Sequence, residues 1–143
     1  PVFDGPERRN QRRNADEIRL WADYLDGADY LVDDDGQPGG IPPDAAFVIL
    51  GDLNADPIRG DSLKGAVQQI LHHPRVQDPL PMGAGGQNTA GFHGGMRVDY
   101  VLPAVTLSIV DSGVCWFGRR DPLVGLNRAS DHHLVWIDLK GAA

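Results

Sequence analysis

Three short motifs hold the side chains of this sequence that can do chemistry together. They are GDLN at residues 51–54, RVDY at 97–100 and SDH at 130–132, and each begins or ends an apolar, strand-like run. Together they supply three carboxylates, one amide and one imidazole. A metal-dependent attack on a phosphate ester needs these groups, because carboxylates bind hard cations and an imidazole moves protons. The ordered set carries far more information than any one motif.

The first motif places a carboxylate and an amide just after a strand. If the chain stays extended, Asp52 and Asn54 lie on the same face, about 6.5–7 Å apart. The two side chains could then reach one phosphoryl group together. The alternative is an Asp-x-Asn turn held by hydrogen bonds from side chain to backbone. The sequence leaves both interpretations open.

The second and third motifs suggest a paired carboxylate and imidazole. Asp99 lies in an alternating apolar run at residues 98–102, where an unpaired buried charge would be costly. Its expected partner is an imidazole or an arginine, and the alternative is an edge-strand aspartate that faces water. A histidine held by a carboxylate has a fixed tautomer and raised basicity, so His132 could take a proton or bind a phosphoryl oxygen.

The elements that must position these residues follow from hydrophobic periodicity. A helix is expected from Asn14 to Leu25, with Ile18, Trp21, Ala22 and Leu25 on its buried face. A second helix is expected to start at a Ser62 cap and to run to Leu71. The expected strands cover 46–50 (buried on both faces), 98–102, 105–109, 113–117 and 134–139, and a glycine-rich loop covers 79–95. This order predicts a mixed α/β (α+β) layer structure.

The composition is that of a globular protein with one domain. The chain has 143 residues and a net charge of -7, and we expect residues 1–143 to form a single domain. A polyanion gains no long-range attraction from this charge, so nucleic acid is a possible but not a favoured substrate. The sequence contains no stretch of membrane-spanning length and no signal peptide. It begins at Pro1 without Met, so we expect the natural N-terminus to be absent, and a periplasmic or secreted location stays open.

The motif set resembles the endonuclease/exonuclease/phosphatase superfamily, which has a DNase-I-like fold. The resemblance runs over roughly residues 10–140 and rests on GDLN, RVDYVL and SDHHLVW in the family's order. It implies that Asp52 orients or deprotonates the attacking water and that Asn54 binds the phosphoryl oxygens. Asp99 would hold the ring of His132, which would contact the phosphate, and Asp131 would bind the cation. The resemblance implies Mg²⁺ as that cation, with Mn²⁺ as the alternative.

The resemblance also implies that this chain is the C-terminal portion of a larger domain. The family's fold is a two-layer β-sandwich with flanking helices, built from two similar halves, and the first half carries a metal-binding Glu that has no equivalent here. We therefore expect half of the sandwich, an incomplete active site and an exposed apolar face. That face would be covered by the missing N-terminal half or by a second copy in a homodimer. The residues expected to contact substrate are Arg13, Thr89 and Phe92, with His93 beside them.

Three functions remain in competition. The acidic balance favours a phosphoesterase that acts on a monoester or a small diester. A metal-dependent nuclease is the alternative from the same superfamily. From a different class comes a non-catalytic binding or assembly module, which the intact motifs argue against.

Overall fold

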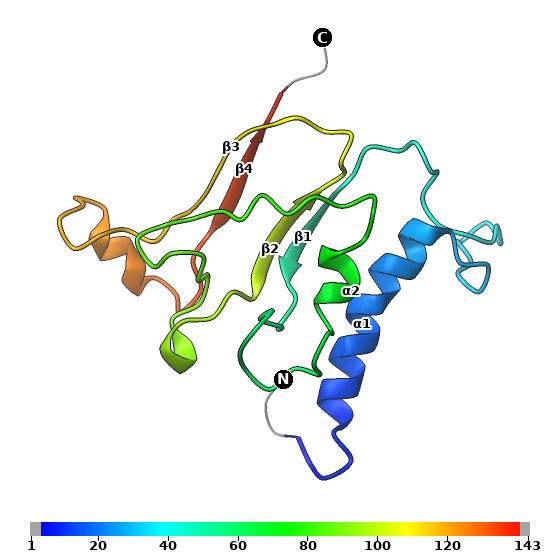
Figure 1. The fold of residues 1–143 in the computed structure, drawn as a ribbon, viewed down its shortest axis with the longest axis horizontal. Helices are drawn as coiled ribbons and strands as arrows, with labels where there is room; N and C mark the ends of the chain where they lie inside the picture. The colour runs from blue at the N-terminus through cyan, green and yellow to red at the C-terminus, as the bar shows by residue number, and fades with distance from the viewer. Residues whose placement is uncertain (1–3, 141–143) are drawn as a thin grey trace.

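The computed structural model describes residues 4–140 and contains helices and antiparallel strands in the expected α+β mixture (Figure 1). The expected fold class is therefore confirmed. The elements in chain order are α1 (Arg9–Asp26), β1 (Val48–Asp52), α2 (Gln68–Leu71), the 3₁₀ helix η1 (Phe92–Gly94), β2 (Asp99–Pro103), β3 (Ile109–Val114), the 3₁₀ helix η2 (Val124–Arg128) and β4 (Val135–Leu139). No helix in this part of the chain is long and hydrophobic enough to span a membrane.

The strands form two antiparallel ladders that meet at the predicted motifs. β1 pairs with β2 and β3 pairs with β4. Figure 1 shows α1 and α2 on one side of the β1–β2 ladder and the β3–β4 ladder on the other. β2 also contacts β4. The start of β2 and the segment that leads into β4 therefore come together, although they are far apart in sequence.

The main core lies between the helices and the inner face of the β1–β2 ladder. Ile18 of α1 and Ile70 of α2 are buried there against Ile49 of β1 and Leu102 of β2. Tyr100 belongs to the same core, and its hydroxyl lies 2.7 Å from the carbonyl oxygen of Ala55. Burying these apolar side chains supplies the main driving force that holds the ladder in place. The ladder is therefore a firm base for side chains at its ends.

The first helix begins five residues before the predicted start, and its buried stripe differs from the prediction. The Asp4 carboxylate accepts hydrogen bonds from the backbone N–H groups of Asn10 (3.2 Å) and Gln11 (2.9 Å), which satisfies donors that a helix start leaves free. Residues 9–13, which precede the predicted helix, are therefore helical. Trp21 is 40% exposed rather than buried. The buried positions of α1 include Asn14, whose amide donates to the carbonyl oxygen of Leu53 at 2.9 Å.

The second helix is much shorter than predicted because Ser62 does not cap it. The Ser62 hydroxyl donates instead to the carbonyl oxygen of Asn54, at 3.0 Å. Gly65 then adopts φ +85, a left-handed conformation that interrupts a right-handed helix. Regular α-helix begins only at Gln68.

The predicted strands next to the three motifs are present, whereas those predicted between residues 105 and 117 differ from the structure. β1 is buried on one face only, since Ile49 is 6% exposed but Leu50 is 67% exposed. Residues 105–108 form a turn, so the predicted strand at 105–109 is wrong. The chain is extended again from Ile109 to Val114, which covers only the start of the strand predicted at 113–117. Alternation alone cannot distinguish a strand from an irregular segment with the same apolar spacing.

Candidate active site

Two carboxylates face each other across the end of the β1–β2 ladder. Asp52 is the last residue of β1, Asp99 is the first residue of β2, and the register pairs them directly. Like charges at opposite positions of an antiparallel pair destabilise the sheet. This end of the ladder therefore needs a positive partner.

The chain turns sharply after Asp52, in the way that the second interpretation of this motif anticipates. One carboxylate oxygen of Asp52 accepts a hydrogen bond from the backbone N–H of Asn54 at 2.7 Å. Asn54 has φ 50, a left-handed conformation that asparagine tolerates better than most residues. The Asn54 side-chain amide also lies 3.4 Å from the other oxygen of Asp52. The turn keeps the carboxylate and the amide together at one exposed corner.

The positive partner is His132. Its Nδ1 lies 2.9 Å and 3.0 Å from the two carboxylate oxygens of Asp99. Because an ionised carboxylate only accepts hydrogen bonds, Nδ1 carries the proton and Nε2 is the ring nitrogen left for a ligand. The Ser130 hydroxyl oxygen accepts a hydrogen bond from the backbone N–H of His132 at 3.0 Å, which shapes the SDH turn.

The surroundings of His132 favour its charged form. Partial burial acts to lower the pKa of the imidazole, but the hydrogen bond and the charge of Asp99 act in the opposite direction. The charges of Asp52 and Asp131 add to the effect of Asp99. The net result is a pKa of His132 above its ordinary value of 6.5.

Thr89 holds both partners of this pair in position. Its side-chain oxygen accepts hydrogen bonds from the backbone N–H groups of Val98 (3.0 Å) and Asp99 (2.9 Å). Its carbonyl oxygen accepts a hydrogen bond from the backbone N–H of His133 at 2.7 Å. Thr89 is completely buried, so the expectation that it contacts substrate is wrong. Its hydrogen bonds hold the start of β2, which carries Asp99, next to the segment that carries His132.

The other two residues expected to contact substrate lie in different places. The ring of Phe92 is tilted against the His132 ring, with 5.5 Å between centroids, so Phe92 forms a wall of the site. Arg13 lies on the exposed surface of α1, where its guanidinium pairs with Glu17 at 3.5 Å. Arg13 lines neither of the hollows beside His132. The structure therefore brings Phe92 to the site but not Arg13.

Three of the predicted residues could share a cation. Ligand atoms of Asp52, Asp99 and His132 all lie within 4.8 Å of one another. Oxygen ligands from carboxylates suit Mg²⁺ or Mn²⁺, and the opposed charges of Asp52 and Asp99 give such an ion a reason to bind. Asp131, the residue expected to bind the cation, is exposed and lies outside this group of three. Its charge still acts on His132.

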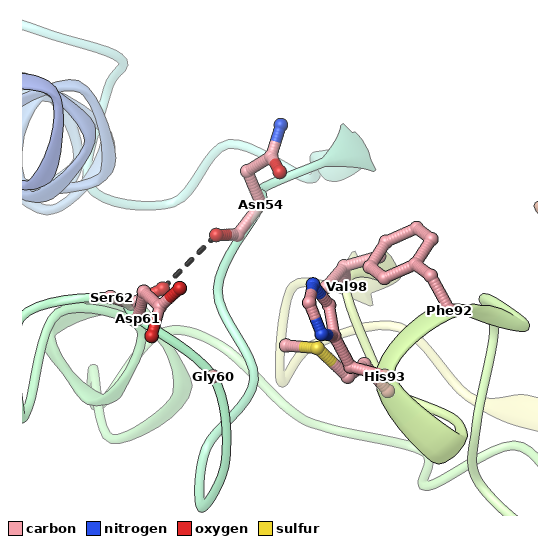
Figure 2. Close-up of a pocket in the computed structure, with 8 residues that line it drawn as sticks. Asn54, Gly60, Asp61, Ser62, Phe92, His93 and Val98 are labelled. Carbon is pink, nitrogen blue, oxygen red and sulfur yellow. Dashed lines mark hydrogen bonds between the residues drawn. The ribbon is translucent and has the colours of Figure 1, made fainter. Parts of the chain in front are cut away.

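Sequence reasoning missed one part of the surroundings of the site. A pocket next to Asn54 and Phe92 is also lined by Asp61, Ser62 and His93 (Figure 2). Of these, His93 was expected near substrate, whereas Ser62 was expected to cap a helix. Nothing in the spacing of Asp61 singles it out, because the turn that brings it near Phe92 depends on contacts between distant segments.

Comparison with known proteins gives one finding. Residues 3–132 match the model of a family described as the Endonuclease/Exonuclease/phosphatase family. No match to a curated protein or to a solved structure was found.

The pairing of Asp99 with His132 predicts a measurable titration in protein kept free of metal by a chelator. The pKa of His132 in the folded protein lies above 6.5. The charged pair of His132 and Asp99 therefore stabilises the fold fully below pH 6.5, and this contribution is lost as the pH rises through the folded-state pKa. Asp99→Asn removes the charge and should lower the pKa of His132. The measurement is an NMR pH titration of the ring signals. The matched control is Asp44→Asn, which removes an exposed carboxylate from the loop before β1. An identical His132 titration in wild type and Asp99→Asn would refute the pairing.

Proposed function

The chain belongs to the endonuclease/exonuclease/phosphatase family, and we propose that it hydrolyses a phosphate ester by in-line attack of an activated water. Members of this family are generally metal-dependent phosphoesterases and nucleases. The observation that carries the proposal is the convergence of Asp52, Asp99 and His132 within 4.8 Å at the end of one strand ladder. This convergence supports a hydrolytic site more strongly than it supports a binding module.

Each side chain has a role that its contacts support. Asp52 accepts a proton from, or orients, the attacking water, because its carboxylate is exposed and fixed by the turn to Asn54. The Asn54 amide donates to a phosphoryl oxygen. His132 presents Nε2 to the phosphate as negative charge develops there, while Asp99 holds the ring and balances its charge. Attack on the phosphorus breaks the bond to the alcohol oxygen, and no covalent intermediate with the protein forms.

A divalent cation fits this donor set. Asp52 and Asp99 would hold it, with Asp131 close enough to add its charge. Bound there, a cation such as Mg²⁺ or Mn²⁺ would offset the charge that develops on the phosphoryl oxygens. Nδ1 of His132 is engaged by Asp99, so this nitrogen would not ligate the cation.

The charges around the site favour a small ester over nucleic acid. Neither hollow beside His132 is lined by a lysine or an arginine. Arg97, which belongs to the second motif, is buried and forms two hydrogen bonds to the Asp78 carboxylate. A groove without basic side chains cannot neutralise the successive phosphates of a nucleic acid strand. We therefore place a monoester or small diester ahead of DNA or RNA as the substrate.

We also propose that a second β-layer covers the outer face of the strands. An apolar groove lies between the two ladders, beside Asp52 and His132, and Leu50 (67% exposed) and Leu134 (69% exposed) line it. The only two glutamates of the sequence pair with arginines, Glu7 with Arg9 and Glu17 with Arg13, so the described site contains no glutamate. In the two-halved fold of this family, the first half supplies both a glutamate and the covering layer.

The exposed groove predicts that residues 1–143, studied alone, pair with a second copy. Burying leucines from both copies removes apolar surface from water. Sedimentation velocity should show a dimer at high concentration. Leu134→Gln should shift the population towards monomer, whereas Leu126→Gln, on an exposed leucine of η2, should not. A monomer at every concentration would exclude self-association through this face.

The proposed roles also predict non-additive losses of activity. Hydrolysis should require Mg²⁺ or Mn²⁺, and His132→Ala should lower turnover by roughly 10²–10⁴-fold with little effect on folding. Asp99→Asn acts through the same imidazole, so the double variant should be no slower than His132→Ala. The assay compares residues 1–143 with the longest natural product that contains them, on a chromogenic monoester, a chromogenic diester and plasmid DNA. If the two losses multiply, Asp99 and His132 act independently and the proposed roles are wrong.

A further inference from the structure

A pocket of about 200 Å³ opens directly beside the candidate active site. It includes Asn54, which forms the turn with Asp52, and Phe92, whose ring lies against His132. A phosphate held between Asn54 and His132 would therefore have this pocket next to it. Figure 2 shows the pocket between the segment of residues 60–62 on one side and Phe92 and His93 on the other.

The pocket is the better of two places for the alcohol part of the ester. The other hollow at the site is the apolar groove lined by Leu50 and Leu134, which is the face that a second β-layer would cover. Phe92 lines the pocket and its ring lies against His132, but the pocket and the groove share no lining residue. A partner that covers the groove therefore need not fill the pocket.

Two polar side chains line opposite sides of the pocket and have capacity for a ligand. Figure 2 shows the Asp61 carboxylate on one side and the His93 ring on the other. In residues 4–140, neither side chain has a hydrogen-bond or ion-pair partner. His93 has φ 50, a left-handed conformation that histidine adopts more often than most residues other than glycine.

The rest of the lining is mixed, with an amide from Asn54, a hydroxyl from Ser62 and an apolar part. Met96 (6% exposed) and Val98 (1% exposed) form the buried part, together with the Phe92 ring. Gly60 lies against the end of the Met96 side chain and has φ +84, a left-handed conformation that favours glycine. The pocket therefore offers a carboxylate, an imidazole, an amide, a hydroxyl and an apolar surface.

We propose that this pocket binds the alcohol part of the substrate, and that this alcohol is an uncharged sugar or polyol. Hydroxyl groups donate to the Asp61 carboxylate and exchange hydrogen bonds with His93, while the C–H face of the ring packs on Met96 and Phe92. A second phosphate would meet the negative charge of Asp61, and no lysine or arginine lines the pocket to balance it. This assignment of a substrate class rests on the proposed function.

The test uses two substrates that differ by one phosphate, glucose 6-phosphate and glucose 1,6-bisphosphate. In the longest natural product that contains this chain, kcat/KM with Mg²⁺ should be higher for the monophosphate. Asp61→Asn should reduce that preference roughly tenfold, because it removes the repulsive charge. Asp44→Asn changes the net charge equally, outside the pocket, and should leave the preference unchanged. A preference for the bisphosphate, or one that Asp61→Asn does not alter, would overturn the proposal.

If no phosphate ester is hydrolysed, that result counts against the proposed function alone. A second measurement then tests the pocket without hydrolysis. Sorbitol, which carries no phosphate, is titrated into the protein while the methyl signals of its two methionines are followed by NMR. Met96 lines the pocket and Met82 does not, so a saturable shift at Met96 alone supports the proposal. The absence of a shift at Met96, or equal shifts at both methionines, would overturn it.

Discussion

The repulsion between Asp52 and Asp99 is the constraint on which the rest of the site depends. The β1–β2 register places these carboxylates directly opposite each other, and the packed core behind the ladder prevents them from moving apart. Such an arrangement is destabilising, and positive charge nearby relieves it. His132 supplies part of it through its contact with Asp99, and a divalent cation is the natural source of the remainder.

The segments around the carboxylates can be understood as supports for this arrangement. The turn at Asn54 fixes Asp52, and the Ser62 hydroxyl fixes the turn through the Asn54 carbonyl oxygen. Thr89 connects the start of β2 to the segment that carries His132. Most of these contacts join residues that lie far apart in sequence. The geometry of the site is therefore a property of the whole described fold and not of any single motif.

The sequence predicted the reactive side chains of the site better than the residues that hold them in position. GDLN and RVDY adjoin strand ends and SDH leads into β4, because local patterns mark these positions. The contact between Asp99 and His132, which the family resemblance implies, is present. The roles of Thr89 and Ser62 were predicted wrongly, since both depend on tertiary hydrogen bonds that local spacing does not encode. The early start of α1 has the same cause, because the cap comes from Asp4, several residues away.

The decisive property of the site is whether a cation binds between the two carboxylates. Mn²⁺ is added in small amounts while the His132 ring signals are followed by NMR, since a bound paramagnetic ion broadens nearby signals. Strong broadening of His132 is expected in the wild type, at least tenfold weaker broadening in Asp52→Asn, and the same broadening as in the wild type in Asp44→Asn. Equal broadening in wild type and Asp52→Asn would show that the ion binds elsewhere and would contradict the central claim.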